Sequence, residues 1–271
     1  MTKGILPRHG RGCKASARPE AADHDILTTA LSTRCITAAV VDERLQLFNE
    51  QLRGSIHDVS VAEAAITSLH GILLDFDPDR LHPNAASRAD RDDPKRLWAN
   101  VVEPWMQRHP VFAKARVVAS GRGLHAILRF SSAVDFTSEC EREYWAAVVQ
   151  VVQKLLPTDP DCPGITALTR PLGSVNGKNG ETVRLLDAGQ PVNPDEVLAL
   201  CADVVARPFA IVAGLLFSSK RITPCPVCQV DSSRLDILDQ VGMCYGGCGK
   251  VQIGQLFDLF LQPRPAKKGG K

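Results

Sequence analysis

The sequence predicts a mixed fold of the α/β or α+β class, followed by a small metal-binding module. Strand-like apolar runs bounded by Gly and other turn residues alternate along the chain with segments of helical periodicity, which is the pattern of a mixed fold. Four of the nine cysteines cluster near the C-terminus, as metal ligands do. The 271 residues leave room for one large domain or two smaller ones.

The two ends of the chain are basic and are expected to lie outside the folded part. Residues 1–24 are rich in Gly, Arg and Ala, and residues 263–271 read PRPAKKGGK. Basic tails either contact phosphates or are simply solvated, and a net charge of +2 is too small to indicate nucleic-acid binding by itself. The N-terminus lacks the apolar core of a secretory signal, and no apolar stretch reaches the ~18 residues of a membrane helix. We therefore expect a cytoplasmic protein with no membrane partner.

Three elements are predicted before the first group of acidic residues. Residues 40–52 have the apolar spacing of an amphipathic helix. Ser60 followed three residues later by Glu63 forms a capping box, which predicts that a second helix begins there. The run GILLDFD, residues 71–77, is apolar and is entered from Gly, so it predicts a buried strand.

The chain then alternates loops, strands and helices up to residue 205. Its clearest helix is 139–156, where apolar residues recur on one face. The other expected elements are a polar loop 78–96, a short helix 98–106 interrupted by Pro104, strands 115–120 and 124–130 joined by a Gly-rich turn, a turn-rich segment 158–180, a strand 181–187 and a helix 194–205.

Asp75 and Asp77 lie at the end of the first strand and place two negative charges close together. Residues two apart in a strand point to the same face, so the two carboxylates project together and repel unless a cation lies between them. Carboxylates are hard oxygen ligands suited to Mg²⁺ or Mn²⁺. The alternative is that the strand simply runs into an acidic turn.

Two further segments carry groups suited to anions. In SGRGLHAILRF, residues 120–130, the glycines allow backbone N–H groups to approach an anion, Arg122 offers a planar cationic fork, and His125 lies within reach. His125 could instead be an ordinary core histidine. In TRPLGSVNGK, residues 169–178, Arg170 and Lys178 flank a Gly-Ser turn; taken alone, this segment reads as a polar surface loop.

In this order, the segments resemble the archaeo-eukaryotic primases and primase-polymerases of the plasmid and phage type. The resemblance covers residues 65–190. ILLDFD matches the family's hhhDhD motif, and RPLGSVNGK matches its R-hP-G-S/T-hN-x-K run, with Pro171 and Leu172 in swapped order. The third metal-binding acid of the family is best matched by Asp159, with Asp161 as the alternative. The family's Ser-Gly-(Arg)-x-Gly-x-His pattern is matched by Ser120, Gly121, Arg122, Gly123 and His125.

The resemblance implies a fold and a reaction. The fold is an RRM-like catalytic core with a smaller N-terminal α/β unit, together spanning residues 25–205. The reaction is template-directed nucleotidyl transfer from NTPs or dNTPs on single-stranded DNA, which makes and extends short primers in plasmid, phage or bacterial replication. By this resemblance Asp75, Asp77 and Asp159 hold two Mg²⁺ or Mn²⁺ ions, and the nucleotide-binding residues are Ser120, Arg122, Gly123, His125, Arg170 and Lys178. The chain has no Walker A sequence, so any unwinding requires a separate helicase.

The late cysteines predict a zinc ribbon within residues 206–262. Their spacing is Cys-x2-Cys, fifteen residues, then Cys-x3-Cys, which reads as a four-thiolate zinc site. A redox pair or a disulfide is the alternative. The ligands are Cys225, Cys228, Cys244 and Cys248. Residues 255–261 are expected to form an apolar helix. We expect the ribbon to contact the template or the initiating nucleotide.

Two other functions remain open at this stage. One is a catalytically inactive primase fold that serves as a nucleic-acid-binding or replication-initiation module; the retained charged residues of all three motifs count against it. The other assigns Asp75 and Asp77 to a glycosyltransferase or other nucleotide-sugar site, which leaves the remaining motifs and the cysteine cluster unexplained.

Overall fold

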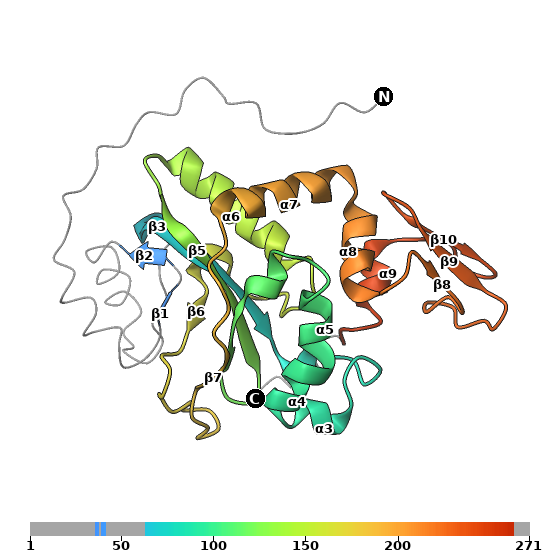
Figure 1. Cartoon of the computed structure of the whole chain (residues 1–271), viewed down its shortest axis with the longest axis horizontal. Helices are drawn as coiled ribbons and strands as arrows, with labels where there is room; N and C mark the ends of the chain where they lie inside the picture. Colours follow the sequence, from blue (N-terminus) through green and yellow to red (C-terminus); the bar gives the residue numbers. More distant parts are fainter. Residues whose placement is uncertain (1–35, 38, 42–62, 263–271) are drawn as a thin grey trace, which may run out of the picture.

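The structure is a computed structural model that describes residues 36–37, 39–41 and 63–262 (Figure 1). Both basic ends and nearly all of the helix expected at 40–52 lie outside these residues. So does most of the expected N-terminal unit; of that unit, β1 (Ile36–Thr37) and β2 (Ala39–Val41) are described. The predicted domain boundaries remain predictions.

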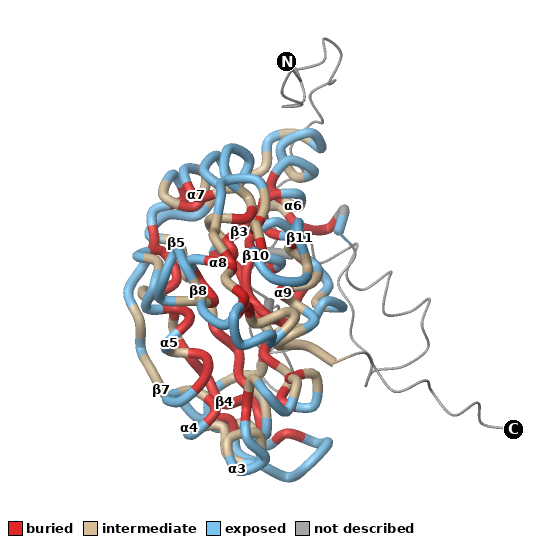
Figure 2. Tube along the Cα trace, turned by 90° about the vertical axis from the view of Figure 1, so that its right-hand side faces the viewer, coloured by how far each residue is buried: buried red, intermediate tan, exposed pale blue. Residues whose placement is uncertain are grey.

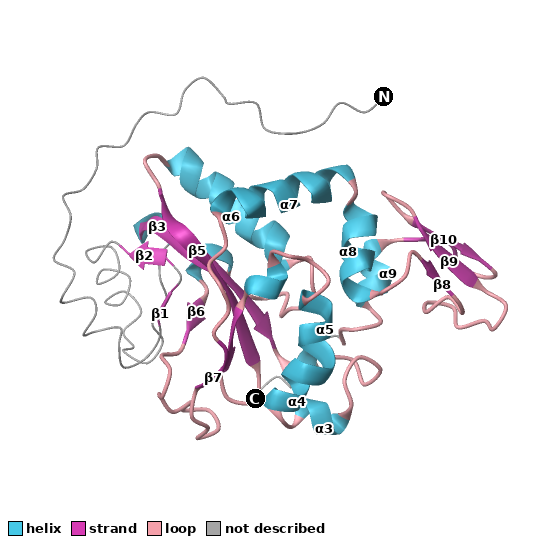
Figure 3. Ribbon diagram, viewed as in Figure 1, coloured by secondary structure: helices cyan, strands magenta, loops and turns pink. Residues whose placement is uncertain are grey.

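An antiparallel sheet of five strands forms the centre of the molecule, in the order β2-β3-β5-β4-β7. Figure 3 shows β3 and β5 running side by side through its middle. The strands are β3 (Ile66–Phe76), β4 (Arg116–Ala119), β5 (Leu124–Asp135) and β7 (Arg184–Asp187). A separate pair joins β1 to β6 (Leu168–Thr169). The Gly-rich turn between β4 and β5 and the strand at 181–187 are where the sequence predicts them.

Helices cover the sheet and complete a mixed α+β fold, as the sequence predicts. α6 (Glu139–Gln153) packs on β3, and α7 (Pro194–Ala206) packs against α6 and β5. α6 buries one face at helical spacing, including Trp145, Val149 and Val152. Figure 2 shows β3 and β4 buried inside this shell.

The prediction that a helix begins at Ser60 is wrong. Within the described part of that segment, a single 3₁₀ turn, η1 (Glu63–Ala65), leads directly into β3. Ile66 and Leu69 are fully or almost fully buried, and both are paired with neighbouring strands. The apolar alternation of this segment and its pairing partners therefore outweigh the local capping signal.

The helix expected at 98–106 is part of a longer helical run that Pro104 does not break. α4 (Pro94–Leu97), a π-helical turn η3 (Trp98–Val102) and α5 (Glu103–Met106) follow one another directly. The wider π turn, in which the Glu103 N–H donates to the Trp98 carbonyl, absorbs the irregularity at the proline. The remaining short helical elements are η2 (Pro78–Arg80), α3 (Arg88–Arg91), η4 (Phe112–Lys114) and η5 (Gly164–Thr166).

The helix α8 (Pro208–Leu216) was not predicted. Its sequence is apolar almost throughout, so it carries no amphipathic signal, and it packs against α5, α7 and α9 (Ile253–Phe257). Among the described residues no single helix is long and apolar enough to cross a membrane; α7 and α8 meet the length and composition test only as a pair bent by 113°.

A second antiparallel sheet follows α8 and carries the four clustered cysteines. Its strand order is β11-β10-β9-β8. The strands are β8 (Arg221–Ile222), β9 (Arg234–Ile237), β10 (Gly242–Tyr245) and β11 (Gly249–Val251). After β11, α9 is shorter than the helix expected at 255–261, because the chain leaves the helix and returns to the main body, where Leu261 pairs with Leu81.

Candidate active site

The three predicted motifs meet at one cleft of about 450 Å³ beside the ends of β3 and β5. All nine residues named from the sequence line it: Asp75, Asp77, Ser120, Arg122, Gly123, His125, Asp159, Arg170 and Lys178. The fold therefore brings together groups that are up to about a hundred residues apart in the chain. Pro78, Asp79, Asn176 and Asn179 also line this cleft and were not named from the sequence.

Three carboxylates form the acidic side of the cleft. Asp75 is the second-last residue of β3, and Asp77 follows the strand, where its Oδ1 accepts a hydrogen bond of 2.9 Å from the Asp79 N–H and so caps η2. The Asp159 N–H donates to the Asp75 carbonyl oxygen at 2.7 Å, which fixes the third acid beside the first. Asp161, the alternative third acid, is exposed and does not line the cleft.

The acidic side carries more negative charge than its surroundings neutralise. Burial, followed by the charges of Asp159 and Asp77, raises the pKa of Asp75 to about 7, although Arg170 and Lys178 act in the opposite direction. Arg80 lies behind the cluster, with its Nε 4.0 Å from Asp159 Oδ1. Three carboxylates that line one cleft, one of which resists ionisation, are donors of the type that suits a hard divalent cation such as Mg²⁺ or Mn²⁺, although their oxygens do not all lie within 4.8 Å of one another.

The turn between β4 and β5 also lines the cleft, beside the end of β3. The Ser120 N–H donates to the Gly123 carbonyl at 3.0 Å and closes the turn. Gly121 has φ +132°, and a Cβ at this position would lie 2.4 Å from Asn176 Nδ2. Only glycine suits both the conformation and the close approach. Arg122 is about half exposed, and its Nη2 contacts Asp79 at 3.2 Å and Asp92 at 3.6 Å.

His125 connects the acidic side to the turn. It is paired with Asp75 across β3 and β5, and its Nε2 lies 3.9 Å from Asp75 Oδ1. Its Nδ1 is hydrogen-bonded to the Thr169 hydroxyl at 2.7 Å. Burial, with a smaller contribution from Arg170, lowers the pKa of His125 to about 4. The imidazole is therefore neutral at physiological pH, and only Nε2 is left to face the cleft.

The third motif reaches the cleft as an irregular hairpin, residues 170–183. Asn176 is buried and donates from Nδ2 to the Ser120 carbonyl at 2.7 Å, while its Oδ1 accepts from the Lys178 N–H at 3.0 Å. This one side chain therefore ties the hairpin to the Gly-rich turn. Asn176 was not among the predicted site residues, although its position in the matched run RPLGSVNGK was the available signal.

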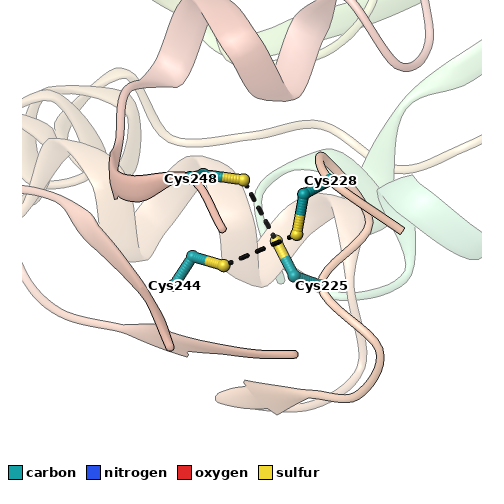
Figure 4. Close-up of side chains that lie close together, drawn as sticks. All are labelled: Cys225, Cys228, Cys244 and Cys248. Carbon is teal, nitrogen blue, oxygen red and sulfur yellow. Dashed lines mark hydrogen bonds between the residues drawn. The ribbon is translucent and has the colours of Figure 1, made fainter. Parts of the chain in front are cut away.

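The four cysteines of the second sheet converge on one point (Figure 4). All four Sγ atoms lie within 4.8 Å of one another, with Cys225–Cys248 at 3.9 Å and Cys228–Cys244 at 3.7 Å. A disulfide would need about 2.05 Å, whereas a tetrahedron with Zn–S bonds of about 2.3 Å has edges of about 3.8 Å. The cluster therefore fits a zinc ion held by four thiolates, which leaves no open position for substrate.

Comparisons with known proteins add little to this geometry. No protein-family model matches the sequence, and no curated protein sequence matches it. A similar solved structure is the AEP domain of the primase-polymerase (PrimPol) of cyanophage S-2L, at 16% identity and a TM-score of 0.34. The alignment covers 65% of this chain and 97% of that one. A likeness at this score supports no assignment of activity.

Proposed function

We propose that this chain is a nucleotidyltransferase of the primase-polymerase kind, which synthesises and extends short primers on single-stranded DNA. The observation that carries the proposal is the composition of the cleft. It combines three carboxylates with a Gly-rich turn and cationic side chains. A metal-bound nucleoside triphosphate needs both, since its metals bind carboxylates and its phosphates bind N–H groups and cations.

On this proposal Asp75, Asp77 and Asp159 hold the divalent ions. When bound, such ions favour attack by a 3′-hydroxyl and stabilise the negative charge of the departing pyrophosphate. The backbone bond from Asp159 to Asp75 holds two of the three acids in place before any ligand arrives. The chain itself thus supplies a preformed anionic pocket, which is the protein's main task in phosphoryl-transfer chemistry.

The remaining residues of the cleft are proposed to bind the triphosphate. Arg122 and Lys178 are exposed enough to turn toward a ligand, and Arg170 already lies close enough to affect the pKa of both Asp75 and His125. His125, held through Nδ1 by Thr169, offers Nε2 to the ligand without adding a charge. These groups compensate phosphate charge.

The second sheet is proposed to bind zinc and to contact the template or the initiating nucleotide. Arg221, Asp236, Met243 and Lys250 lie in one cross-strand row, whereas the alternate residues Leu235, Cys244 and Val251 are buried on the other face. Tyr245 is exposed beside this row, with the Arg234 guanidinium 4.8 Å from its ring centre. An aromatic ring among cations suits a single nucleic-acid strand.

The test is a primer-synthesis assay on single-stranded DNA with labelled NTPs or dNTPs and Mg²⁺ or Mn²⁺. We expect short labelled products from the wild type, none from the Asp75→Ala/Asp77→Ala double variant, and normal products from the control Asp161→Ala, which removes an exposed acid outside the cleft. Extension of a supplied primer without synthesis of new ones would narrow the function to a polymerase.

Two outcomes would overturn the proposal. No product under any condition, with DNA binding intact in both proteins, would favour the inactive nucleic-acid-binding module. Turnover of nucleotide sugars in place of free NTPs would favour the glycosyltransferase alternative.

A further inference from the structure

After the cysteine-bearing sheet, the chain returns to the main body and packs beside the acidic cleft. After α9, residues 258–262, which we name the C-terminal strap, lie along the loop 78–82. Leu261 forms an antiparallel bridge with Leu81, the His82 N–H donates to the Phe260 carbonyl at 2.8 Å, and the Gln262 N–H donates to the Arg80 carbonyl at 2.8 Å. The Gln262 side chain adds a third hydrogen bond, from Nε2 to the Asp79 carbonyl at 2.9 Å. The strap thus acts as an additional strand beside this loop.

The loop beneath the strap directly follows Asp77. Its Asp79 contacts Arg122, its Arg80 lies 4.0 Å from Asp159, and the Asp77 carbonyl accepts from the Arg80 N–H at 3.0 Å. The only helical element in the loop is the three-residue η2, which is too short to be stable by itself. The position of Asp77 relative to the other acids therefore depends on what packs against the loop.

The strap is anchored on the side away from the cleft. The Phe260 ring packs edge-on against Trp105 at 5.5 Å between ring centres and lies 5.8 Å from the Phe217 ring. Upstream, α9 is held by Leu256, which is fully buried, and it follows β11 of the cysteine-bearing sheet after one residue. A shift of that sheet would therefore move the start of the strap.

We infer that the C-terminal strap is a positioning element for the divalent-metal site, with Gln262 as its principal residue, and that it links the four-cysteine site to the cleft. Loss of the strap contacts frees the loop 78–82, and Asp77 then spends less time beside Asp75 and Asp159. The consequence is weaker metal binding rather than a slower chemical step. This inference rests on the proposed function only in that the cleft binds Mg²⁺ or Mn²⁺.

The experiment measures Mn²⁺ binding to the full-length protein by electron paramagnetic resonance, without nucleotide or DNA. Gln262→Pro removes both the N–H donor to Arg80 and the side-chain donor to Asp79, and we expect a roughly tenfold loss of Mn²⁺ affinity. The control Asp258→Asn changes an exposed strap residue outside the hydrogen bonds that join the strap to the loop. It should bind Mn²⁺ as the wild type does.

Two further measurements separate positioning from a general loss of structure. Loss of the zinc ligand in Cys228→Ser should weaken Mn²⁺ binding but should add little to the loss in Gln262→Pro when the two changes are combined, because both act through the strap. In primer synthesis, Gln262→Pro should need more Mn²⁺ for half-maximal rate yet reach the wild-type rate at saturation. If this variant fails to fold, Gln262→Ala, which loses only the side-chain bond, should show a smaller loss of affinity.

Wild-type Mn²⁺ affinity in both Gln262 variants would overturn the inference while leaving the proposed function intact. Absence of Mn²⁺ binding in the wild type would overturn the acidic metal centre itself, and the inference with it.

Discussion

Replacing Asp75 by Asn should make the metal-free protein more stable at pH 8. The reason is the raised pKa of Asp75, because a carboxyl that ionises near pH 7 in the folded chain but near pH 3.8 when unfolded penalises folding once the solution pH exceeds 3.8. The penalty is absent below pH 3.8, grows between the two values and is complete above pH 7. Asn keeps the shape of the side chain without its charge.

The size of the gain in stability follows from the shift in the pKa of Asp75. A rise from 3.8 to about 7 corresponds to a ceiling of roughly 4 kcal/mol. Because 34% of the Asp75 side chain is exposed, solvent screens part of this cost, and we take about half, roughly 2 kcal/mol. For a folded unit of this size that is a rise in Tm of about 4–8 °C. At pH 5.5, midway between the two pKa values, the gain should fall by about half.

The assay is thermal unfolding followed by circular dichroism in buffer without added divalent ions or chelator, so that the cysteine site is undisturbed. Saturating Mn²⁺ should then give the wild type a higher Tm than Asp75→Asn. An ion at a hundred times its Kd stabilises the wild type by about 2.7 kcal/mol, but it finds one ligand fewer in Asp75→Asn. A metal-free Tm at pH 8 equal to or below that of the wild type would refute the reasoning, since it would mean that the acidic cluster carries no stored repulsion.

Three further predictions concern the other parts of the molecule. Gly121→Ala should displace Asn176 and weaken binding of a fluorescent nucleotide at least tenfold, because the new Cβ would lie 2.4 Å from Nδ2; Gly177→Ala, with no atom within 4 Å, should bind normally. A nitrogen-15 NMR titration should find His125 neutral from pH 8 down to about 5.5, since its pKa is lowered to about 4, and protonation above pH 6 would contradict this. Elemental analysis should find one zinc per chain, and Cys228→Ser should lose most of it together with several kcal/mol of stability.

Local sequence patterns were sufficient for the elements whose partners are close in the chain. The turn from Ser120 to Gly123 joins two strands that pair with each other, and α6 (Glu139–Gln153), which ends three residues before the predicted 156, buries one face of regular spacing, so each could be predicted from a short window. The cysteine knuckles are equally local, because ligand spacing within each pair fixes their geometry. The nine cleft residues were named because the motifs, in their order along the chain, resemble those of the archaeo-eukaryotic primases, and each motif is a short segment.

Elements that depend on distant partners were not predictable in this way. The segment after Ser60 has a helix-start signal, but its residues become a strand because β2 and β5 pair with it. Asn176 reads as a turn residue until the hairpin meets the Ser120 carbonyl. The pairing of Leu81 with Leu261 joins positions 180 residues apart, and nothing in either segment specifies the other.

The acidic and the cationic groups of the cleft are held by different kinds of contact, and this difference has a consequence for ligand binding. Asp75 is fixed by the register of β3 with β5, and Asp159 is fixed by its backbone N–H to the Asp75 carbonyl. Backbone bonds of this kind cannot relax the repulsion between carboxylates, so the repulsion persists until a cation arrives. The exposed or half-exposed cations, Lys178 and Arg122, instead lie on turns. Metal binding should therefore relieve the repulsion between the carboxylates, whereas nucleotide binding should order the turns that carry these cations.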